Sequence, residues 1–258
     1  MRKLTQPEAV DYWRSLHRRS TGDLEAVCFP DRPNAFNRFF DWMQRFAVRN
    51  CLKQAGLSVQ GGTLLDIGCG RGRWLDFYEA RGARVAGIDI SMDAVGACRR
   101  RGFTVCSGSV DNLPFADGSF DWVNSITVLL HIPPPNQARA VQEIQRVLKP
   151  GGHALLLENT SADRSWHVWG APVALWAERF EGSRRIIAAN HYFIPLFRLL
   201  WRIPVVGGKV SLRNFLELVL LPAAYVVEYW LMRIRQGKPG TAGLQHLMVF
   251  RKSVGNAF

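Results

Sequence analysis

An acidic residue followed by three closely spaced glycines stands out in the first third of the chain. In the stretch LLDIGCGRGRWL, residues 64–75, Asp66 is followed by Gly68, Gly70 and Gly72. Glycine has no Cβ, so the backbone at such positions can turn sharply and approach a ligand closely. A helix that starts directly after the turn would offer free N–H groups to that ligand. The stretch therefore predicts a nucleotide-type binding loop, although the same loop could serve only to pack a helix against a strand.

A second acidic residue follows at a spacing that suits a ribose contact. Residues 85–89, VAGID, form an apolar run that ends in Asp89. A carboxylate at the end of a second strand, about 20 residues after the glycine loop, can accept hydrogen bonds from ribose hydroxyls. Two common phosphate-binding patterns do not fit. Arg73 stands where the dinucleotide fingerprint needs its third glycine, and the lysine-containing phosphate loop is missing.

Alternating strands and helices must hold these residues in place. Short apolar runs predict strands, and apolar residues at helical spacing predict the helices between them. This alternation predicts an α/β fold with a Rossmann-like, doubly wound and mostly parallel sheet. The expected strands are residues 63–67, 85–89, 103–106, 120–125 and 153–158, and the expected helices are residues 72–80, 91–101 and 136–148.

The remaining segments flank this core or interrupt it. Residues 1–60 predict a helical N-terminal cover, whereas residues 61–160 and 241–258 predict the α/β core, which ends in a late strand. Residues 161–240 hold five of the nine tryptophans and predict a helical, tryptophan-rich cap inserted after the fifth strand. The helices expected in this cap are residues 166–180, 190–203 and 212–235, and residues 204–210 are a weak candidate for a sixth strand.

Further motifs follow in a fixed order. Residues 112–115, NLPF, lead to Phe120 and Asp121, and residues 146–152 read RVLKPGG. Together with the glycine loop and Asp89, they make residues 61–158 resemble the class I S-adenosylmethionine-dependent methyltransferases that act on small molecules and lipids. The resemblance implies S-adenosylmethionine as the cofactor and an antiparallel last strand. It also implies cofactor contacts from Asp66, Gly68, Cys69, Gly70, Gly72, Asp89, Ile90, Ser109, Val110, Asp111 and Ser125.

The adenine-binding segment departs from the family pattern. Members of the family often carry an aspartate there, and the alignment on residues 113–115 places Ser109 at that position and Val110 after it. The serine hydroxyl could accept a hydrogen bond from the adenine amino group, and Asp111 could serve instead. Both alternatives stay open.

The methyl group on a sulfonium is already activated, so the protein's main task is to align an acceptor and exclude water. A hydroxyl acceptor also benefits from a general base. His131, which follows the fourth predicted strand, is the first candidate because imidazole titrates near neutral pH. His191 and Tyr192, in the predicted cap, are second candidates. Each of the three could instead have a purely structural role.

Several function classes are disfavoured. Residues 124–127 read NSIT instead of the Asn/Asp-Pro-Pro-aromatic motif of amino-methylating DNA enzymes, and no acidic metal ligands stand near them. We therefore expect no metal site, and nucleic acid is not the favoured partner. Five cysteines without a C-x-x-C pair suggest reduced thiols, and no signal peptide is visible, so a cytoplasmic location is expected.

The net charge and the apolar cap indicate which kinds of partner and acceptor to expect. The net charge of +12 implies attraction to an acidic partner, with anionic lipid among the candidates, although a generally basic proteome would explain it too. Residues 212–235 are strongly apolar, but Glu217 and Glu228 leave only ten uncharged residues between them, whereas a membrane span needs about 20. The cap could rest on the inner face of an anionic membrane, or its helices could pack on each other over a pocket.

These features predict methyl transfer to a small hydrophobic or lipid-linked acceptor, with oxygen favoured over carbon. Two alternatives remain open. One is different chemistry with the same cofactor, and the other is a peripheral membrane protein with a vestigial cofactor site.

Overall fold

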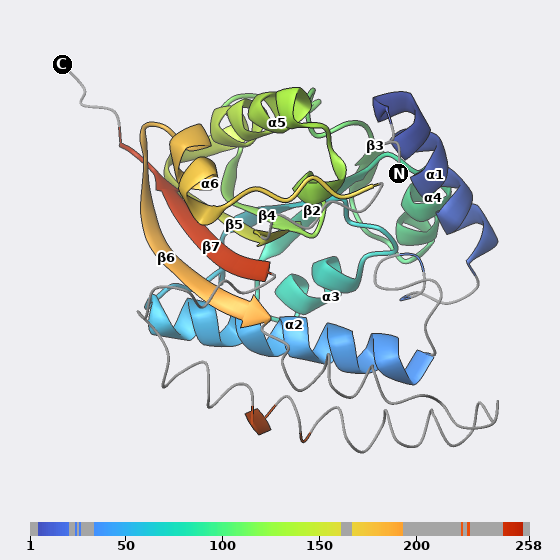
Figure 1. The fold of residues 1–258 in the computed structure, drawn as a ribbon, viewed down its shortest axis with the longest axis horizontal. Coiled ribbons are helices and arrows are strands. Elements are labelled where there is room, and N and C mark those ends of the chain that lie inside the picture. Colours follow the sequence, from blue (N-terminus) through green and yellow to red (C-terminus); the bar gives the residue numbers. More distant parts are fainter. Residues whose placement is uncertain are drawn as a thin grey trace.

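A seven-stranded sheet with the order β3-β2-β1-β4-β5-β7-β6 forms the centre of the computed structural model (Figure 1). The structure describes residues 5–20, 24, 26, 34–160, 167–192, 223, 226–227 and 245–254. Strands β1 to β5 pair in parallel, and β7 runs antiparallel to both β5 and β6. The predicted doubly wound, mostly parallel sheet is therefore confirmed. The strands are β1 (Thr63–Ile67), β2 (Arg84–Asp89), β3 (Val105–Ser107), β4 (Phe120–Ile126), β5 (Leu148–Asn159), β6 (Ser183–Tyr192) and β7 (Gln245–Lys252).

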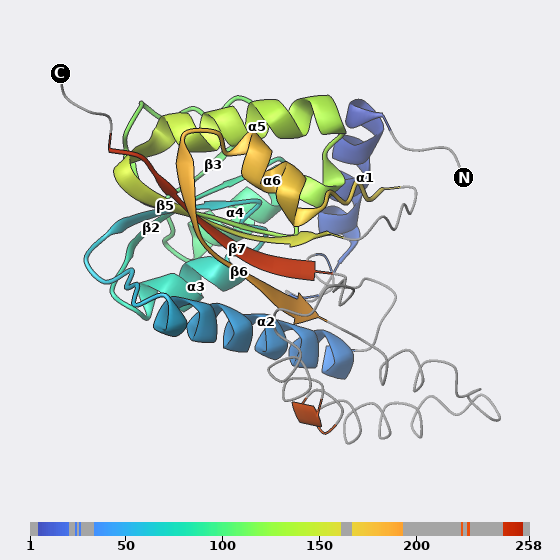
Figure 2. The same cartoon turned by 60° about the vertical axis from the view of Figure 1, so that its left-hand side comes forward.

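Helices cover both faces of the sheet (Figures 1 and 2). Helices α2 and α3 lie on one face, and α5 and α6 lie on the other. Helix α4 packs beside α3, and α1 lies along α4. The described helices are α1 (Gln6–Arg19), α2 (Asn34–Gln54), α3 (Arg73–Glu79), α4 (Met92–Arg100), the short 3-10 helix η1 (Leu129–His131), α5 (Pro134–Val147) and α6 (Val173–Arg179).

The central strands are apolar on both sides because both sides are covered. On β5, Leu155 and Leu157 pack with α2 and α3, whereas Ala154 and Leu156 pack with α5 and α6. The same alternation on β4 sends Asn124 toward α3 and the next residue toward α5, since successive side chains of a strand face opposite ways. Residues of the site therefore leave the sheet on two different faces.

The start of α5 differs from the prediction. The helix expected at residues 136–148 begins two residues earlier, because α5 starts at Pro134. Proline suits the first turn of a helix because the N–H that it lacks would have no partner in that turn. The Asn136 side chain bonds to Asp111 on the neighbouring loop.

Strand β6 corrects the prediction of an entirely helical cap. Residues 183–192, assigned to that cap, pair with β7 at the edge of the sheet, and among the described residues of the cap before them the seven-residue α6 is the one helix. The pairing shifts register between Arg185 and Ile187, and both Ile186 and Ile187 pack against the core beneath α2. This bulge breaks the alternation by which a half-buried strand is recognised in a sequence.

The predicted helix at residues 190–203 begins inside β6, and its remainder lies outside the described residues. The weak strand candidate at residues 204–210 lies outside them too. The predicted helix at residues 212–235 also lies outside them, apart from Ala223, Val226 and Val227. Among the described residues, no helix has both the length and the apolar character needed to cross a bilayer.

Candidate cofactor and acceptor site

The glycine loop turns sharply between β1 and α3 and is hydrogen-bonded to the end of β2. The N–H groups of Gly68 and Cys69 both donate to the carbonyl of Ile88, at 2.8 and 3.1 Å. Gly68 has a φ of +64°, and a Cβ at this position would lie 2.5 Å from Cγ2 of Val128. Only glycine fits here, because the loop backbone passes directly against the segment that follows β4.

Asp89 joins the end of β2 to this loop. Its Oδ2 accepts a hydrogen bond from the N–H of Gly70, and its Oδ1 accepts one from the N–H of Ser91, both at 2.8 Å. Each carboxylate oxygen has a second lone pair, so both can still accept from a ligand. The structure thus brings together the glycine loop and the acidic residue that were predicted from separate stretches of the sequence.

Asp66 is the end of a buried polar chain on the α3 side of the sheet. The hydroxyl of Tyr78 donates to Oδ1 of Asn124 at 2.8 Å, and Nδ2 of Asn124 donates to Oδ1 of Asp66 at 2.6 Å. Oδ2 of Asp66 is buried and has no hydrogen-bond partner. Burial raises the pKa of Asp66 to about 7, and the hydrogen bond from Asn124 opposes that shift.

This orphaned oxygen fits the cofactor that the motifs imply. Buried carboxylate oxygens are almost always paired, and a cationic donor is the best partner for one beside a glycine loop. S-adenosylmethionine carries an α-ammonium group that can supply such a donor. The residues present therefore suit this cofactor.

A cluster of charged residues ties α2 to the start of α3. Nη1 of Arg73 contacts Oδ1 of Asp41 at 2.8 Å, and Nε of Arg45 contacts Oδ2 of Asp41 at 2.7 Å. Nη2 of Arg45 also donates to the carbonyl of Arg73 at 3.0 Å. Sequence reasoning used Arg73 only to exclude the dinucleotide fingerprint. The role of this cluster was missed, because nothing in the sequence pairs residues 32 positions apart.

The polar side chains of the predicted adenine segment are hydrogen-bonded to protein groups. The Ser109 hydroxyl donates to Oδ1 of Asp111, and Nδ2 of Asn136 donates to Oδ2 of Asp111 at 2.7 Å. Val110 is buried in the core. The two alternatives for the adenine contact, Ser109 and Asp111, are thus bonded to each other. Their part in cofactor binding stays a prediction.

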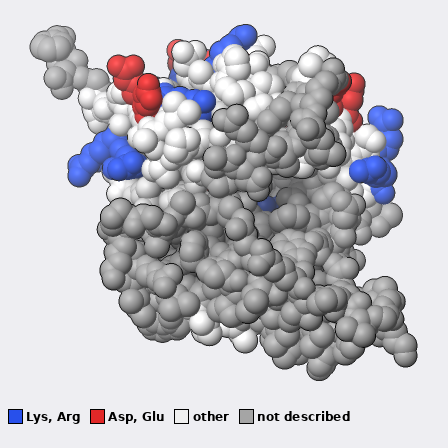
Figure 3. Space-filling model, in the orientation of Figure 1, with Lys and Arg blue, Asp and Glu red and all other residues white. Residues whose placement is uncertain are grey.

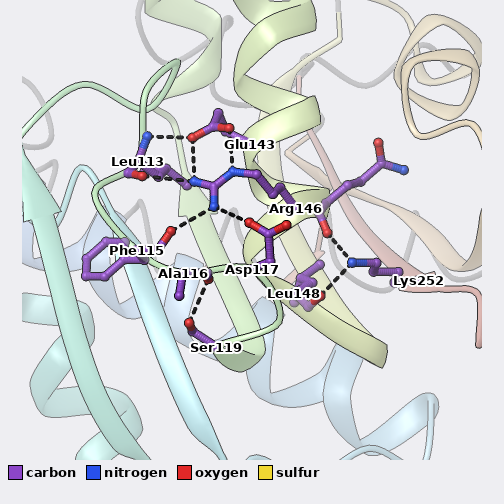
Figure 4. A network of polar contacts seen from close by, with 10 residues as sticks. Leu113, Phe115, Ala116, Asp117, Ser119, Glu143, Arg146, Leu148 and Lys252 are labelled. Carbon is purple, nitrogen blue, oxygen red and sulfur yellow. Dashed lines mark hydrogen bonds and ion pairs between the residues drawn. The ribbon is translucent and has the colours of Figure 1, made fainter.

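Arg146 of α5 fixes the chain that follows this segment (Figure 4). Its guanidinium donates to both carboxylate oxygens of Glu143, to Asp117, and to the carbonyls of Leu113 and Phe115, all within 2.7–2.9 Å. These contacts use all five N–H donors of the arginine. Glu143 completes the set by accepting from the N–H of Leu113 at 2.7 Å. The RVLKPGG motif therefore positions the wall of the predicted adenine site.

Glu158, at the end of β5, holds the turn after β4. Its carboxylate accepts from the N–H groups of Val128, Leu129 and Leu130 at 3.3, 3.1 and 2.9 Å, and from the Ser125 hydroxyl at 3.3 Å. It is fully buried, and burial raises its pKa to about 8. The Ser125 hydroxyl donates to Glu158, on the opposite side of the sheet from Asp66, and the cofactor contact expected of Ser125 stays a prediction.

His131 lies on η1, directly after the residues that Glu158 holds. Its Nδ1 is 2.9 Å from the carbonyl of His167, and its ring stacks on the His167 ring with centroids 5.2 Å apart. The Trp13 ring of α1 lies against it at 4.5 Å. Burial lowers the pKa of His131 to about 3. A carbonyl can only accept, so Nδ1 carries the proton, and the lone pair of the neutral ring is on Nε2.

The second candidates for the base are placed only in part. His191 and Tyr192 form the end of β6, where Tyr192 lies opposite Gln245 of β7. Their side chains lie outside what the structure describes, so their roles stay predictions.

The chain is similar to known methyltransferases in sequence and in fold. Residues 65–156 match the family model described as a methyltransferase domain. An uncharacterized methyltransferase of Mycobacteroides abscessus is 32% identical over 200 residues, which are 72% of this chain and 69% of that protein. A ubiquinone biosynthesis O-methyltransferase of Methylococcus capsulatus is 37% identical over 106 residues, which are 38% of this chain and 44% of that protein.

A solved structure agrees with this similarity. An S-adenosylmethionine-dependent methyltransferase from Mesorhizobium loti has a TM-score of 0.52 at 17% identity, over 79% of this chain and 96% of that one. The chain spans about half the length of several curated relatives that it matches. The longer match to the Mycobacteroides protein, the domain match and the shared fold show that this chain belongs to the family of class I S-adenosylmethionine-dependent methyltransferases.

Proposed function

We propose that this protein transfers the methyl group of S-adenosylmethionine to a hydroxyl group of a small hydrophobic or lipid-linked acceptor. The observation that carries the proposal is the orientation of His131. Its Nδ1 is fixed by a backbone carbonyl, so Nε2 is free to accept the proton of an acceptor hydroxyl.

On this proposal the cofactor is held by the two acidic residues of the loop. Oδ2 of Asp66, which is buried without a partner, receives the α-ammonium group. The remaining lone pairs of Asp89 accept from the ribose hydroxyls. The bound cofactor supplies an electrophilic methyl group on a sulfonium. Because the glycine loop lacks side chains, its backbone can approach the cofactor closely.

The protein's own contribution to the reaction is alignment and proton removal. Burial keeps His131 neutral at pH 7, and the neutral ring is the form that can take a proton. A pKa of about 3 corrects the near-neutral titration expected from the sequence and lies below the range in which a general base works best, so the bound acceptor must raise the basicity of His131 before it can contribute the roughly 10²–10⁴-fold of a well-matched base. The Trp13 and His167 rings pack against the His131 ring and fix its orientation.

The nature of the acceptor is argued from relatives and composition. The Methylococcus relative is named for O-methylation in ubiquinone biosynthesis, which favours an aromatic hydroxyl on an apolar molecule. The lipid-linked option rests on the apolar cap sequence and the net charge of +12. On the face in Figure 3, most of the described Lys and Arg side chains form separate groups near the edges, and a small basic patch lies near the centre. The membrane part of the proposal therefore depends on the cap.

The acceptor class is tested with labelled cofactor. S-adenosylmethionine with a labelled methyl group is incubated with the protein and with a prenylated catechol, a long-chain fatty acid or a lipid extract. We expect label in a methyl ether or ester, which mass spectrometry distinguishes from a carbon–methyl bond. Label on carbon would refute oxygen transfer, and product formation without label would point to different chemistry with the same cofactor.

The membrane contact is tested separately by flotation with liposomes. Binding is expected to rise with anionic lipid content, to fall with salt, and to weaken when Arg198 and Arg202 are replaced by glutamate. A protein that stays wholly unbound to anionic liposomes at low salt would leave a freely diffusing hydrophobic acceptor as the answer.

A further inference from the structure

The C-terminal half of α1 contacts both the glycine loop and the chain that follows β2. Nη2 of Arg71, in the glycine loop, donates to the carbonyls of His17 and Ser20 at 3.2 and 2.7 Å. On the other wall, Nε of Arg14 donates to the carbonyl of Ile90, directly after Asp89, at 3.3 Å. Both ribbon views show α1 lying along α4 beside these strand ends (Figures 1 and 2). Helix α1 is therefore hydrogen-bonded to both segments that carry the predicted cofactor contacts.

His17 is the residue of α1 that faces inward at this point. It is only 4% exposed, and its Nδ1 is buried without a hydrogen-bond partner. Burial lowers its pKa, and the charges acting on the ring are those of Asp89, Arg71 and Asp93. His17 thus has a buried ring nitrogen without a partner, within electrostatic range of Arg71 in the glycine loop and of Asp89 at the end of β2.

Such a nitrogen calls for a partner that the protein itself does not provide. Buried polar atoms in folded proteins are nearly always hydrogen-bonded to protein groups or ordered water, so an unpaired one calls for an explanation, and a bound ligand is one. Asp89 keeps free lone pairs after its two backbone contacts, and its charge acts on the His17 ring. A hydroxyl group can satisfy both residues at once, because it donates one hydrogen bond and accepts another.

We propose that His17 is a ribose-binding residue: a ribose hydroxyl of the adenosyl group donates to Asp89 and accepts from Nδ1–H of His17. The inference rests on the proposed function only in that the ligand is an adenosyl cofactor. It adds that the ribose site is incomplete without α1 and that the protein distinguishes ribose from deoxyribose through this helix.

The test couples a change in the protein to a change in the ligand. S-adenosylhomocysteine and its 2′-deoxy and 3′-deoxy analogues are titrated calorimetrically into the wild type and into His17→Leu. We expect His17→Leu to bind S-adenosylhomocysteine about tenfold more weakly, the effect of one buried hydrogen bond. The wild type should bind the analogue that lacks the hydroxyl contacted by His17 more weakly than S-adenosylhomocysteine. In His17→Leu the ratio of these two affinities should be about tenfold smaller, because the variant has already lost the partner of that hydroxyl.

Two further variants keep the result interpretable. His17→Gln retains a donor and should recover part of the affinity, which covers the case that His17→Leu folds poorly. Arg18→Ala removes a 3.6 Å contact with Asp93 that is mostly exposed, and it should bind like the wild type. Equal affinity of wild type and His17→Leu, or an unchanged penalty for both analogues, would overturn the proposal and leave the proposed function intact. A wild type that does not bind S-adenosylhomocysteine would instead overturn the proposed function.

Discussion

Removing the Asn124 amide should shift the pH at which the protein loses its cofactor. Asn124 donates to Oδ1 of Asp66 at 2.6 Å in a site where both residues are almost completely buried. Asn124→Leu keeps the size of the side chain and removes the donor. In the proposed complex, Asp66 must be ionised to bind the α-ammonium, so a proton on Asp66 competes with the cofactor.

The size of the shift follows from that one hydrogen bond. Burial raises the pKa of Asp66 to about 7, and Asn124 is the strongest group holding it down. A hydrogen bond to a charged group contributes about 1.5–3 kcal/mol, and one pKa unit corresponds to about 1.4 kcal/mol. The pKa of Asp66 should therefore rise by about one to two units. Below its pKa, cofactor affinity falls about tenfold per pH unit, so the loss of affinity relative to the wild type should be largest at pH 6, below both pKa values, and smallest near pH 9.

The assay is calorimetric titration of S-adenosylhomocysteine from pH 6 to pH 9. Tyr78→Phe is the matched control, because it removes a hydroxyl from the same chain but leaves the Asn124–Asp66 bond in place. The double variant Tyr78→Phe/Asn124→Leu avoids an unpaired tyrosine hydroxyl. An affinity profile of Asn124→Leu with the same midpoint as the wild type would refute the assignment of Asp66 to the ammonium group.

Three further substitutions test other parts of the site. His131→Ala should leave cofactor affinity unchanged and lower methyl transfer by about 10²–10⁴-fold, and unchanged turnover would make His131 structural. Glu158→Gln should lose about 1–3 kcal/mol in urea unfolding, because an amide donor then faces the Leu130 N–H. Between about pH 4.5 and pH 8, Glu158 holds a proton in the folded wild type but not in the unfolded chain, so the free energy of unfolding contributed by this group should fall as the pH rises. Glu158→Gln has no such proton, so a difference in unfolding free energy between wild type and variant that stays constant with pH would contradict the assignment. Arg146→Met should weaken cofactor binding, because two carbonyls and Glu143 lose their donor; unchanged affinity in the same titration would separate this loop from the site.

The parts of the site that were predicted correctly are local in sequence. The glycine loop, the strand before it and the carboxylate at the end of β2 each lie within a few residues, and parallel strands bring their carboxyl ends to one edge. The structure confirms that Asp89 meets Gly70 at this edge. The fold class was predicted for the same reason, since each strand and helix of the core has its own apolar period.

The parts that were missed depend on pairs far apart in the chain. Glu158 accepts from the N–H groups of Leu129 and Leu130, about 30 residues earlier, and no local sequence pattern predicts this contact. The Asp41–Arg73 pair and the unpaired nitrogen of His17 depend on how α1 and α2 dock, which no local pattern reveals. Strand β6 escaped detection because its bulge hides the alternation of its side chains.

The most direct test of the cofactor assignment is the affinity of Asp89→Ala for S-adenosylmethionine. Asp93→Ala, which changes a half-exposed acid on α4, is the matched control. Calorimetry of the wild type should show saturable binding, the control should match it, and Asp89→Ala should lose about 1.5–3 kcal/mol, or roughly ten- to a hundredfold. Binding by Asp89→Ala as tight as that of the wild type would contradict the account.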